Sequence, residues 1–155
     1  MKKEKSQTPR GSRSQRTRVL FVCVGNACRS PMAEAIARYD AADVMEASSA
    51  GLYPLGYIAE LTKQTLMKNA YSVSGLTSDR IEREAMDSAD LIINMTGTPG
   101  EHVFGSKENV EDWLVEDPYG QDTETYQRVF EGIRRRVNQL ALSLREKRVS
   151  QKTGR

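Results

Sequence analysis

One stretch of the chain, residues 19–36, constrains the fold more than any other, because it has the pattern of a strand, a short loop and a helix in direct succession. Residues 19–22 are all apolar and mostly β-branched or aromatic, which is typical of a buried strand. Residues 31–38 favour a helix, with Ser30 as the expected N-cap and Pro31 in the first turn. Gly25 and Asn26, the residue types that most readily adopt positive φ, lie in the loop between them. The stretch therefore predicts an α/β fold with a loop curled over a helix N-terminus.

The same loop carries residues suited to phosphoryl transfer. Backbone N–H groups around a helix N-terminus form a concave anion site, and the helix dipole favours the negative charge. Cys23 opens the loop and Arg29 closes it. The positive potential favours the thiolate form of Cys23, and a guanidinium can hold two oxygens of a tetrahedral anion. With Ser30 donating its hydroxyl to the thiolate, these groups predict attack on phosphorus through a cysteinyl-phosphate.

The sequence VCVGNACRSPMAE at 22–34 resembles, almost residue for residue, the signature of the low-molecular-weight protein tyrosine phosphatases. This family also includes thioredoxin-coupled arsenate reductases and bacterial protein-arginine phosphatases, and the resemblance extends over about residues 18–146. It implies that Cys23 is the nucleophile, that Arg29 and the loop amides bind phosphate, and that no metal or cofactor takes part. The resemblance assigns these residues to the phosphate-binding loop or its support: Val24, Gly25, Asn26, Ala27, Cys28, Ser30 and Ser49.

Ser49 belongs to a Ser-Ala-Gly sequence at 49–51 that resembles the family's own, in which the serine supports the loop asparagine. A hydroxyl bonded to Asn26 would hold the loop open before phosphate arrives. The alternative is an ordinary turn at the end of a strand.

The rest of the chain alternates between strand and helix patterns, which predicts parallel βαβ units and right-handed crossovers. We expect a three-layer α/β/α fold with a four-stranded parallel sheet flanked by helices. The expected strands are 19–22, 44–49, 89–95 and 110–115, and the expected later helices are 58–70, 77–89 (capped by Thr77 or Ser78) and a long one that begins at Asp122 or Thr123. The apolar stripe of that last helix consists of Tyr126, Val129, Ile133, Val137, Leu140 and Leu144.

Asp117 lies where the fourth strand ends, in the sequence Glu116-Asp117-Pro118-Tyr119-Gly120. Ligands bind at the carboxyl ends of parallel strands, where the Cys23 loop is also expected. An oxygen leaving group needs a proton as its bond to phosphorus breaks, and the attacking water must later lose one. The segment resembles the family's Asp-Pro-Tyr, which implies that Asp117 is the general acid and base.

The substrate is expected to be a phosphorylated protein, and the cleft walls are expected to include Leu52, Tyr53 and Tyr119. Val24 follows the nucleophile where the arginine phosphatases are associated with threonine, which favours phosphotyrosine. The 117–120 segment and the long last helix are similar to the arginine-phosphatase branch, which keeps phosphoarginine as the alternative. Arsenate reduction is less favoured because no cysteine follows Cys28, and a non-catalytic phosphate-binding module is the remaining alternative.

Cys28 has two interpretations. It is either a resolving thiol that forms a reversible disulfide with oxidised Cys23, or a small residue packed beneath the loop. The family also carries a cysteine here, which favours the protective role. The lone His102 has no cluster of ligand-type residues around it, so we expect no metal site there.

The overall charge of +2 conceals two basic ends. Residues 1–18 carry a net +6 and residues 145–155 a net +4, while residues 19–144 carry −8. We expect one phosphatase domain at 18–146 between disordered basic tails at 1–17 and 147–155, which could bind an acidic partner but indicate no specific nucleic acid. No apolar run is long enough to span a membrane, and two cysteines in a reactive loop indicate a reducing cytoplasm.

Overall fold

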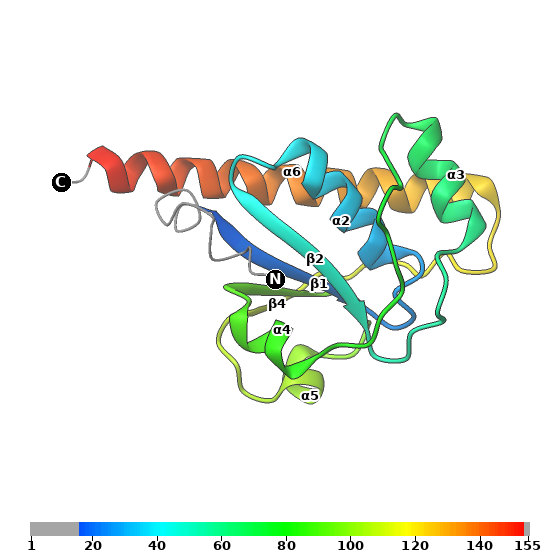
Figure 1. Cartoon of the computed structure of the whole chain (residues 1–155), viewed down its shortest axis with the longest axis horizontal. Helices are drawn as coiled ribbons and strands as arrows, with labels where there is room; N and C mark the ends of the chain where they lie inside the picture. The colour runs from blue at the N-terminus through cyan, green and yellow to red at the C-terminus, as the bar shows by residue number, and fades with distance from the viewer. Residues whose placement is uncertain (1–15, 154–155) are drawn as a thin grey trace, which may run out of the picture.

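The computed structural model describes residues 16–153, which form a four-stranded, fully parallel sheet with helices on both faces (Figure 1). The strand order is β2-β1-β3-β4. The strands are β1 Thr17–Cys23, β2 Met45–Gly51, β3 Leu91–Asn94 and β4 Val110–Asp112, and the helices are α2 Arg29–Asp40, α3 Glu60–Lys68, α4 Arg83–Ser88, α5 Gly100–Phe104 and α6 Thr123–Thr153. The expected fold class is confirmed.

The side chains of β1 alternate between two apolar layers. Phe21 packs with α2 and α6 on one face of the sheet, in a cluster that contains Met32 and Phe130. Leu20 and Val22 point to the other face, where α4 and α5 cover a smaller cluster. Because both faces are covered, the central strand is apolar at every core position, as the continuous run at 19–22 predicts.

The stripe expected on the last helix is also observed. Four of its six residues are fully buried against the sheet and α2, and Leu140 and Leu144 pack at the edge of the same cluster. The helix lies along the whole length of the sheet and extends beyond it at the end where the strands begin (Figure 1).

Two predicted helix starts are wrong. Thr77 and Ser78 do not cap a helix, since α4 begins only at Arg83. The segment before it is extended and adds to the edge of β2, with the Gly51 N–H donating to the Asp79 carbonyl at 2.8 Å. Ser30 is not an N-cap either, because it lies inside α2, whose N-cap is Cys28. In both places tertiary hydrogen bonds use the groups that the local pattern assigns to a cap.

The expected tails also differ from the structure where it describes them. Residues 147–153 continue α6 instead of forming a disordered tail. Asp43 fixes this part of the helix, accepting hydrogen bonds from Arg145 at 2.8 and 2.9 Å through its carboxylate and from Arg148 at 2.9 Å through its carbonyl. At the other end Thr17 is already in β1, and residues 1–15 of the expected tail lie outside the described residues.

β4 is shorter than expected and ends at Asp112. The Trp113 N–H still pairs with the Asn94 carbonyl at 2.9 Å, and the chain then leaves the sheet. Among residues 16–153 no helix is long and apolar enough to cross a membrane.

Candidate active site

The loop from Cys23 to Arg29 connects β1 to α2 at the carboxyl edge of the sheet. Its carbonyls are bonded on the outside of the loop: those of Cys23, Val24, Gly25 and Ala27 accept hydrogen bonds from the backbone of residues 52, 53, 55 and 59. A loop whose carbonyls are held outward turns its N–H groups to the concave side, where they can bind an anion. The segment that follows β2 therefore holds the loop with its N–H groups on the concave side, as the sequence predicts.

Asn26 holds the turn of this loop. It is fully buried and has φ +48°, in the left-handed region. Its side-chain amide donates to the hydroxyls of Ser30 at 2.8 Å and Ser49 at 3.1 Å, and its carbonyl oxygen accepts from the Asp79 N–H at 2.7 Å. The structure thus places Ser49 against Asn26, as the Ser-Ala-Gly resemblance implies.

The Ser49 hydroxyl in turn donates to the Glu34 carboxylate at 2.5 Å. Glu34 lies on α2, has a side chain only 8% exposed and forms an ion pair with Arg38. Burial raises the pKa of Glu34, and the hydrogen bond from Ser49 and the charge of Arg38 only partly offset it. Glu34 belongs to the 22–34 signature, but it is not among the residues expected to support the loop.

The Cys23 thiol lies at the floor of the loop and is 3.0 Å from the Ser30 hydroxyl. The Ser30 N–H donates to the same sulfur at 3.4 Å. Both groups are buried in the first turn of α2. The structure thus places a hydroxyl and an N–H donor of the α2 N-terminus against the Cys23 sulfur.

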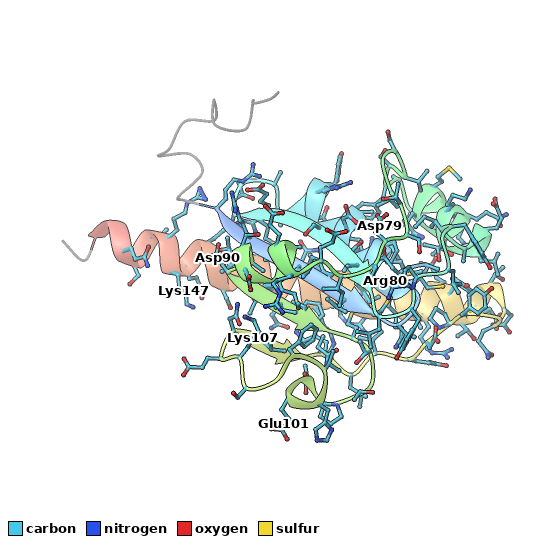
Figure 2. The ribbon with its side chains drawn as sticks, turned by 60° about the horizontal axis from the view of Figure 1, so that its bottom comes forward. Asp79, Arg80, Asp90, Glu101, Lys107 and Lys147 are labelled. Atoms are coloured by element: carbon cyan, nitrogen blue, oxygen red, sulfur yellow. The ribbon has the colours of Figure 1, made fainter. Side chains whose placement is uncertain are left out.

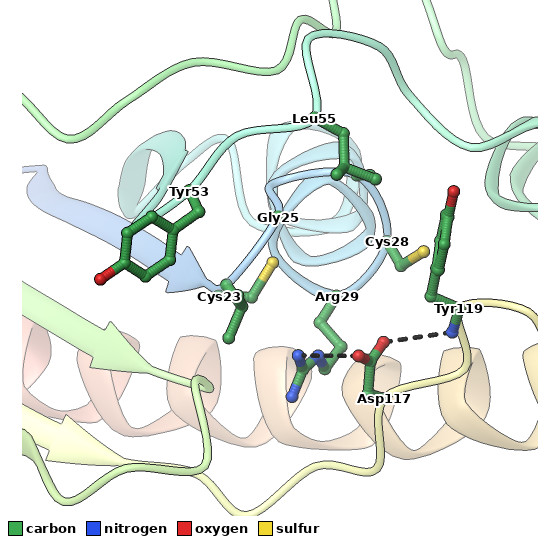
Figure 3. Close-up of a pocket in the computed structure, with 10 residues that line it drawn as sticks. Cys23, Gly25, Cys28, Arg29, Tyr53, Leu55, Asp117 and Tyr119 are labelled. Atoms are coloured by element: carbon green, nitrogen blue, oxygen red, sulfur yellow. Dashed lines mark hydrogen bonds and ion pairs between the residues drawn. The ribbon is translucent and has the colours of Figure 1, made fainter.

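Arg29 is buried and held by two backbone carbonyls. One terminal nitrogen, Nη1, donates to Met95 at 2.7 Å and to Val115 at 3.2 Å. The other, Nη2, is 3.5 Å from a carboxylate oxygen of Asp117 (Figure 3). Of the buried side-chain nitrogen and oxygen atoms in the described part of the chain, only Arg29 Nε has no hydrogen-bond partner. A buried donor without a partner is costly, so its presence beside the thiol indicates a binding site for an anion.

Asp117 comes from the segment after β4, as expected, and its carboxylate is on the solvent side of Arg29. Its side chain is 55% exposed. The Tyr119 N–H donates to its second oxygen at 3.1 Å (Figure 3). This turn directs the carboxylate into the pocket above the thiol, where a leaving group would need its proton.

The pocket has a volume of about 290 Å³ and mainly apolar walls. Tyr53 and Tyr119 lie on opposite sides of it, with Leu55 above the loop (Figure 3). Leu52, which the sequence analysis also placed in the cleft, instead packs against the apolar cluster under α4 and α5. The remaining lining residues come from the loop and the Asp117 turn: Cys23, Val24, Gly25, Ala27, Cys28, Arg29 and Asp117.

Sequence reasoning missed Leu55 and Tyr57. The Tyr57 hydroxyl forms a hydrogen bond of 2.7 Å with that of Tyr119, which lines the pocket. This contact raises the pKa of Tyr119. Gly56, with φ +88°, lies at a bend of the chain between Leu55 and Tyr57. In the sequence, Gly56 was the available signal for such a bend, since glycine adopts positive φ readily.

Cys28 lines the inner side of the pocket, and its thiol is 3.3 Å from the buried hydroxyl of Tyr126 on α6. Burial is the main reason that the pKa of Cys28 is raised. Both cysteines are free thiols in the structure. The protective disulfide with Cys23 stays a prediction.

His102 lies in α5, away from the pocket residues. Within residues 16–153 no group of His, Cys, Asp and Glu side chains is arranged to hold a metal ion.

Comparisons with known proteins agree with this geometry. The family model described as low molecular weight phosphotyrosine protein phosphatase matches residues 18–151. A glutaredoxin arsenate reductase from Synechocystis sp. is 35% identical over 79% of this chain and 95% of its own length.

Two solved structures are similar over most of the chain. An arginine phosphatase, YwlE, from Geobacillus stearothermophilus superposes with a TM-score of 0.78 at 25% identity, covering 86% of this chain and 96% of its own. A low molecular weight protein tyrosine phosphatase from T. tengcongensis has a TM-score of 0.72 at 29% identity, covering 82% of this chain and 99% of its own.

Proposed function

The chain belongs to the low molecular weight phosphotyrosine protein phosphatase family, and from that premise we propose that it hydrolyses phosphotyrosine in proteins through a cysteinyl-phosphate. The observation that carries this proposal is the arrangement of Arg29. Its Nε is buried without a partner and its Nη1 is held by carbonyls. The edge of the guanidinium that carries Nε and Nη2 remains for a ligand, and its two N–H groups match two oxygens of a phosphoryl group.

In the proposed mechanism the Cys23 sulfur attacks phosphorus, and the bond to the tyrosine oxygen breaks as Asp117 gives that oxygen a proton. The loop N–H groups and Arg29 stabilise the charge on the equatorial oxygens. Asp117 then takes a proton from water, which attacks the phosphocysteine and releases phosphate. The Ser30 hydroxyl, 3.0 Å from the sulfur, stabilises the thiolate as it leaves.

The pocket walls support an aromatic substrate. Tyr53 and Tyr119 lie on opposite sides of the site (Figure 3), and Val24 adds an apolar contact beside the nucleophile. A flat ring gains from contact with aromatic faces on two sides. Phosphoarginine is also long and planar, and the likeness to an arginine phosphatase keeps it as the alternative substrate.

Arsenate reduction is a second candidate, because a relative 35% identical carries that name. Arsenate is a tetrahedral oxyanion like phosphate, so the loop suits both. Its reduction takes two electrons from thiols, and beyond Cys23 the sequence supplies only Cys28, whose thiol lies against Tyr126. A proton donor such as Asp117 is needed when the bond between phosphorus and the tyrosine oxygen breaks, so its presence favours the phosphatase reaction.

The test compares wild type, Cys23→Ser and Asp117→Asn on phosphotyrosine and phosphoarginine peptides, with arsenate reduction assayed beside them. We expect phosphotyrosine turnover that is abolished in Cys23→Ser. In Asp117→Asn, kcat should fall by about 10²–10⁴-fold, the usual contribution of a general acid.

The outcomes separate the candidates. Faster turnover of phosphoarginine would assign the alternative substrate, and arsenate reduction without hydrolysis of either peptide would assign the reductase. A folded, reduced wild type with none of these activities would contradict the proposal.

A further inference from the structure

A second hollow lies beside the catalytic pocket, along the segment that leads to Asp117. We call it the arginine groove; its volume is about 570 Å³. One wall is the 114–116 segment and the other is the exposed side of α6. Val115 connects the two sites, because its carbonyl accepts a hydrogen bond from Arg29 and the same residue lines the groove.

The charge of the groove is positive. It is lined by the guanidinium groups of Arg128, Arg135 and Arg136 and by the single carboxylate of Glu116. Glu116 is paired with Arg128 at 2.9 Å, and Arg136 lies over the Trp113 ring and donates to the Leu114 carbonyl at 3.4 Å. The Arg135 side chain is exposed, and within residues 16–153 it makes no hydrogen bond or ion pair. Arg135 and Arg136 thus have no carboxylate partner among the described residues. They form a locally positive site in a region, residues 19–144, whose net charge is −8.

The groove also has apolar surface. The Leu114 side chain is 84% exposed at its rim, while Val129 forms part of its floor. Exposed guanidiniums beside apolar side chains suit a polypeptide that presents carboxylates together with apolar groups. A small anion would not use the apolar part.

The chain's own N-terminal residues do not suit the groove. Residues 1–15 carry a net charge of +4, so the arginines would repel them. The occupant must be acidic and must come from another molecule.

We propose that the arginine groove binds an acidic segment of the protein substrate, next to the phosphorylated residue that enters the catalytic pocket. This inference rests on the proposed phosphatase function and deepens it. Val115 and Asp117 are two residues apart, which is about 7 Å of extended chain. A substrate residue only a few positions from the phosphorylated one therefore reaches the groove.

Such binding acts on recognition and not on the chemical step. Exposed charges raise the rate of encounter and lower KM, they leave kcat unchanged, and salt screens them. The groove therefore discriminates among phosphoproteins by the acidic residues around the phosphorylated site.

The test exchanges one charge in the groove and one outside it. Arg135→Glu is compared with Lys147→Glu, which makes the same charge change on the same helix about 18 Å away. Lys147 is exposed near the C-terminal end of α6 (Figure 2) and does not line the groove. The substrates are p-nitrophenyl phosphate and three phosphotyrosine peptides. One peptide carries glutamates before the phosphotyrosine, one carries them after it, and one carries glutamines in both places.

We expect Arg135→Glu to raise KM for one of the two glutamate peptides by about tenfold, with kcat unchanged. The glutamine peptide and p-nitrophenyl phosphate should change by less than about twofold, and Lys147→Glu should behave like wild type. Added salt should remove most of the difference between wild type and Arg135→Glu.

Binding to Cys23→Ser gives a readout that does not depend on turnover. The labelled glutamate peptide should bind Cys23→Ser about tenfold more tightly than Cys23→Ser/Arg135→Glu. The groove proposal would be overturned if Lys147→Glu weakened binding of the glutamate peptide as much as Arg135→Glu does, or if Arg135→Glu affected all peptides equally. It would also be overturned if an RNA or an anionic vesicle bound as tightly as the glutamate peptide and Arg135→Glu weakened that binding too. Absence of all turnover by wild type would instead overturn the phosphatase itself.

Discussion

Glu34 is an acid placed where its charge is unfavourable. Its carboxylate is buried on α2 and accepts the Ser49 hydroxyl, which in turn supports Asn26. The folded protein binds a proton on Glu34 more tightly than the unfolded chain does, since burial raises its pKa above the ordinary value of 4.5. Ionised Glu34 therefore costs folding free energy at neutral pH, and this cost is absent below about pH 4.5.

We predict that Glu34→Gln gains stability relative to wild type as the pH rises. The amide oxygen can still accept the Ser49 hydroxyl, and it carries no charge to bury. The difference in unfolding free energy between Gln and wild type should be constant below about pH 4.5 and should increase through the window between 4.5 and the raised folded pKa. Urea unfolding at a series of pH values measures it, and a difference that shrinks with pH would contradict the assigned direction.

At this scale the sequence predicts the candidate site residues. Cys23 and Arg29 could be proposed because they flank a strand–loop–helix junction, and Asp117 because its segment resembles the family's Asp-Pro-Tyr. The structure brings the three together at one pocket. Leu52 and Leu55 could not be assigned correctly, because the apolar pattern of 52–57 does not say which side chains line the pocket. Which of them do so depends on the neighbouring segments and not on residue type.

The close contact between β2 and the Cys23 loop requires a glycine, Gly51, at the end of the strand. A Cβ on Gly51 would lie 2.8 Å from the Val24 carbonyl oxygen and 2.8 Å from the Asn26 Cβ. Both neighbours are held, one by the Tyr53 N–H and the other by the network around Asn26. The loop and the strand therefore touch at a point where only glycine fits.

Gly51→Ala should destabilise the protein by about 1–3 kcal/mol, the usual cost of adding a methyl group to a packed site. It should also weaken inhibition by inorganic phosphate, because Asn26 must shift. The matched control is Gly132→Ala on α6, where the nearest atom to a new Cβ is the flexible end of Arg135 at 3.9 Å. The control should be neutral or more stable in denaturant titration, and equal losses in both variants would contradict the steric argument.

Elements with a strong internal period were predicted well, and elements set by their neighbours were not. β1 and the buried stripe of α6 follow from apolar periodicity alone. The segment 77–82 has helix-cap residues, but Ser78 and Asp79 bond to Gly25 and Asn26 instead. β4 ends at Asp112, and three residues later the Val115 carbonyl accepts a hydrogen bond from Arg29. In each case a contact distant in sequence outweighs a local preference.

The whole molecule depends on the larger of its two apolar clusters, on the α2 and α6 face of the sheet. Phe130 of α6 is fully buried there, with Tyr71 against its ring at 5.7 Å. On the same face the single tryptophan, Trp113, packs against Phe21 of β1 at 6.0 Å. The indole fluorescence therefore reports on the packing of the sheet.

Phe130→Ala should lower the unfolding free energy by about 3–5 kcal/mol. Because one core joins α6 to the sheet, circular dichroism and Trp113 fluorescence should report the same shifted midpoint. Leu142→Ala, on the same helix but 54% exposed, should change stability by less than about 0.5 kcal/mol. Separate transitions for the two probes would show that α6 unfolds independently of the sheet.

The anchoring of Arg29 has a consequence for the order of events during refolding. Its guanidinium is fixed by carbonyls 66 and 86 residues further along the chain, one just after β3 and one just after β4. Contacts between such distant residues form slowly, whereas a helix such as α2 forms early. A refolding chain will therefore regain its helical signal before it regains the ability to bind an oxyanion, and recovery of turnover will time the arrival of the last two strands.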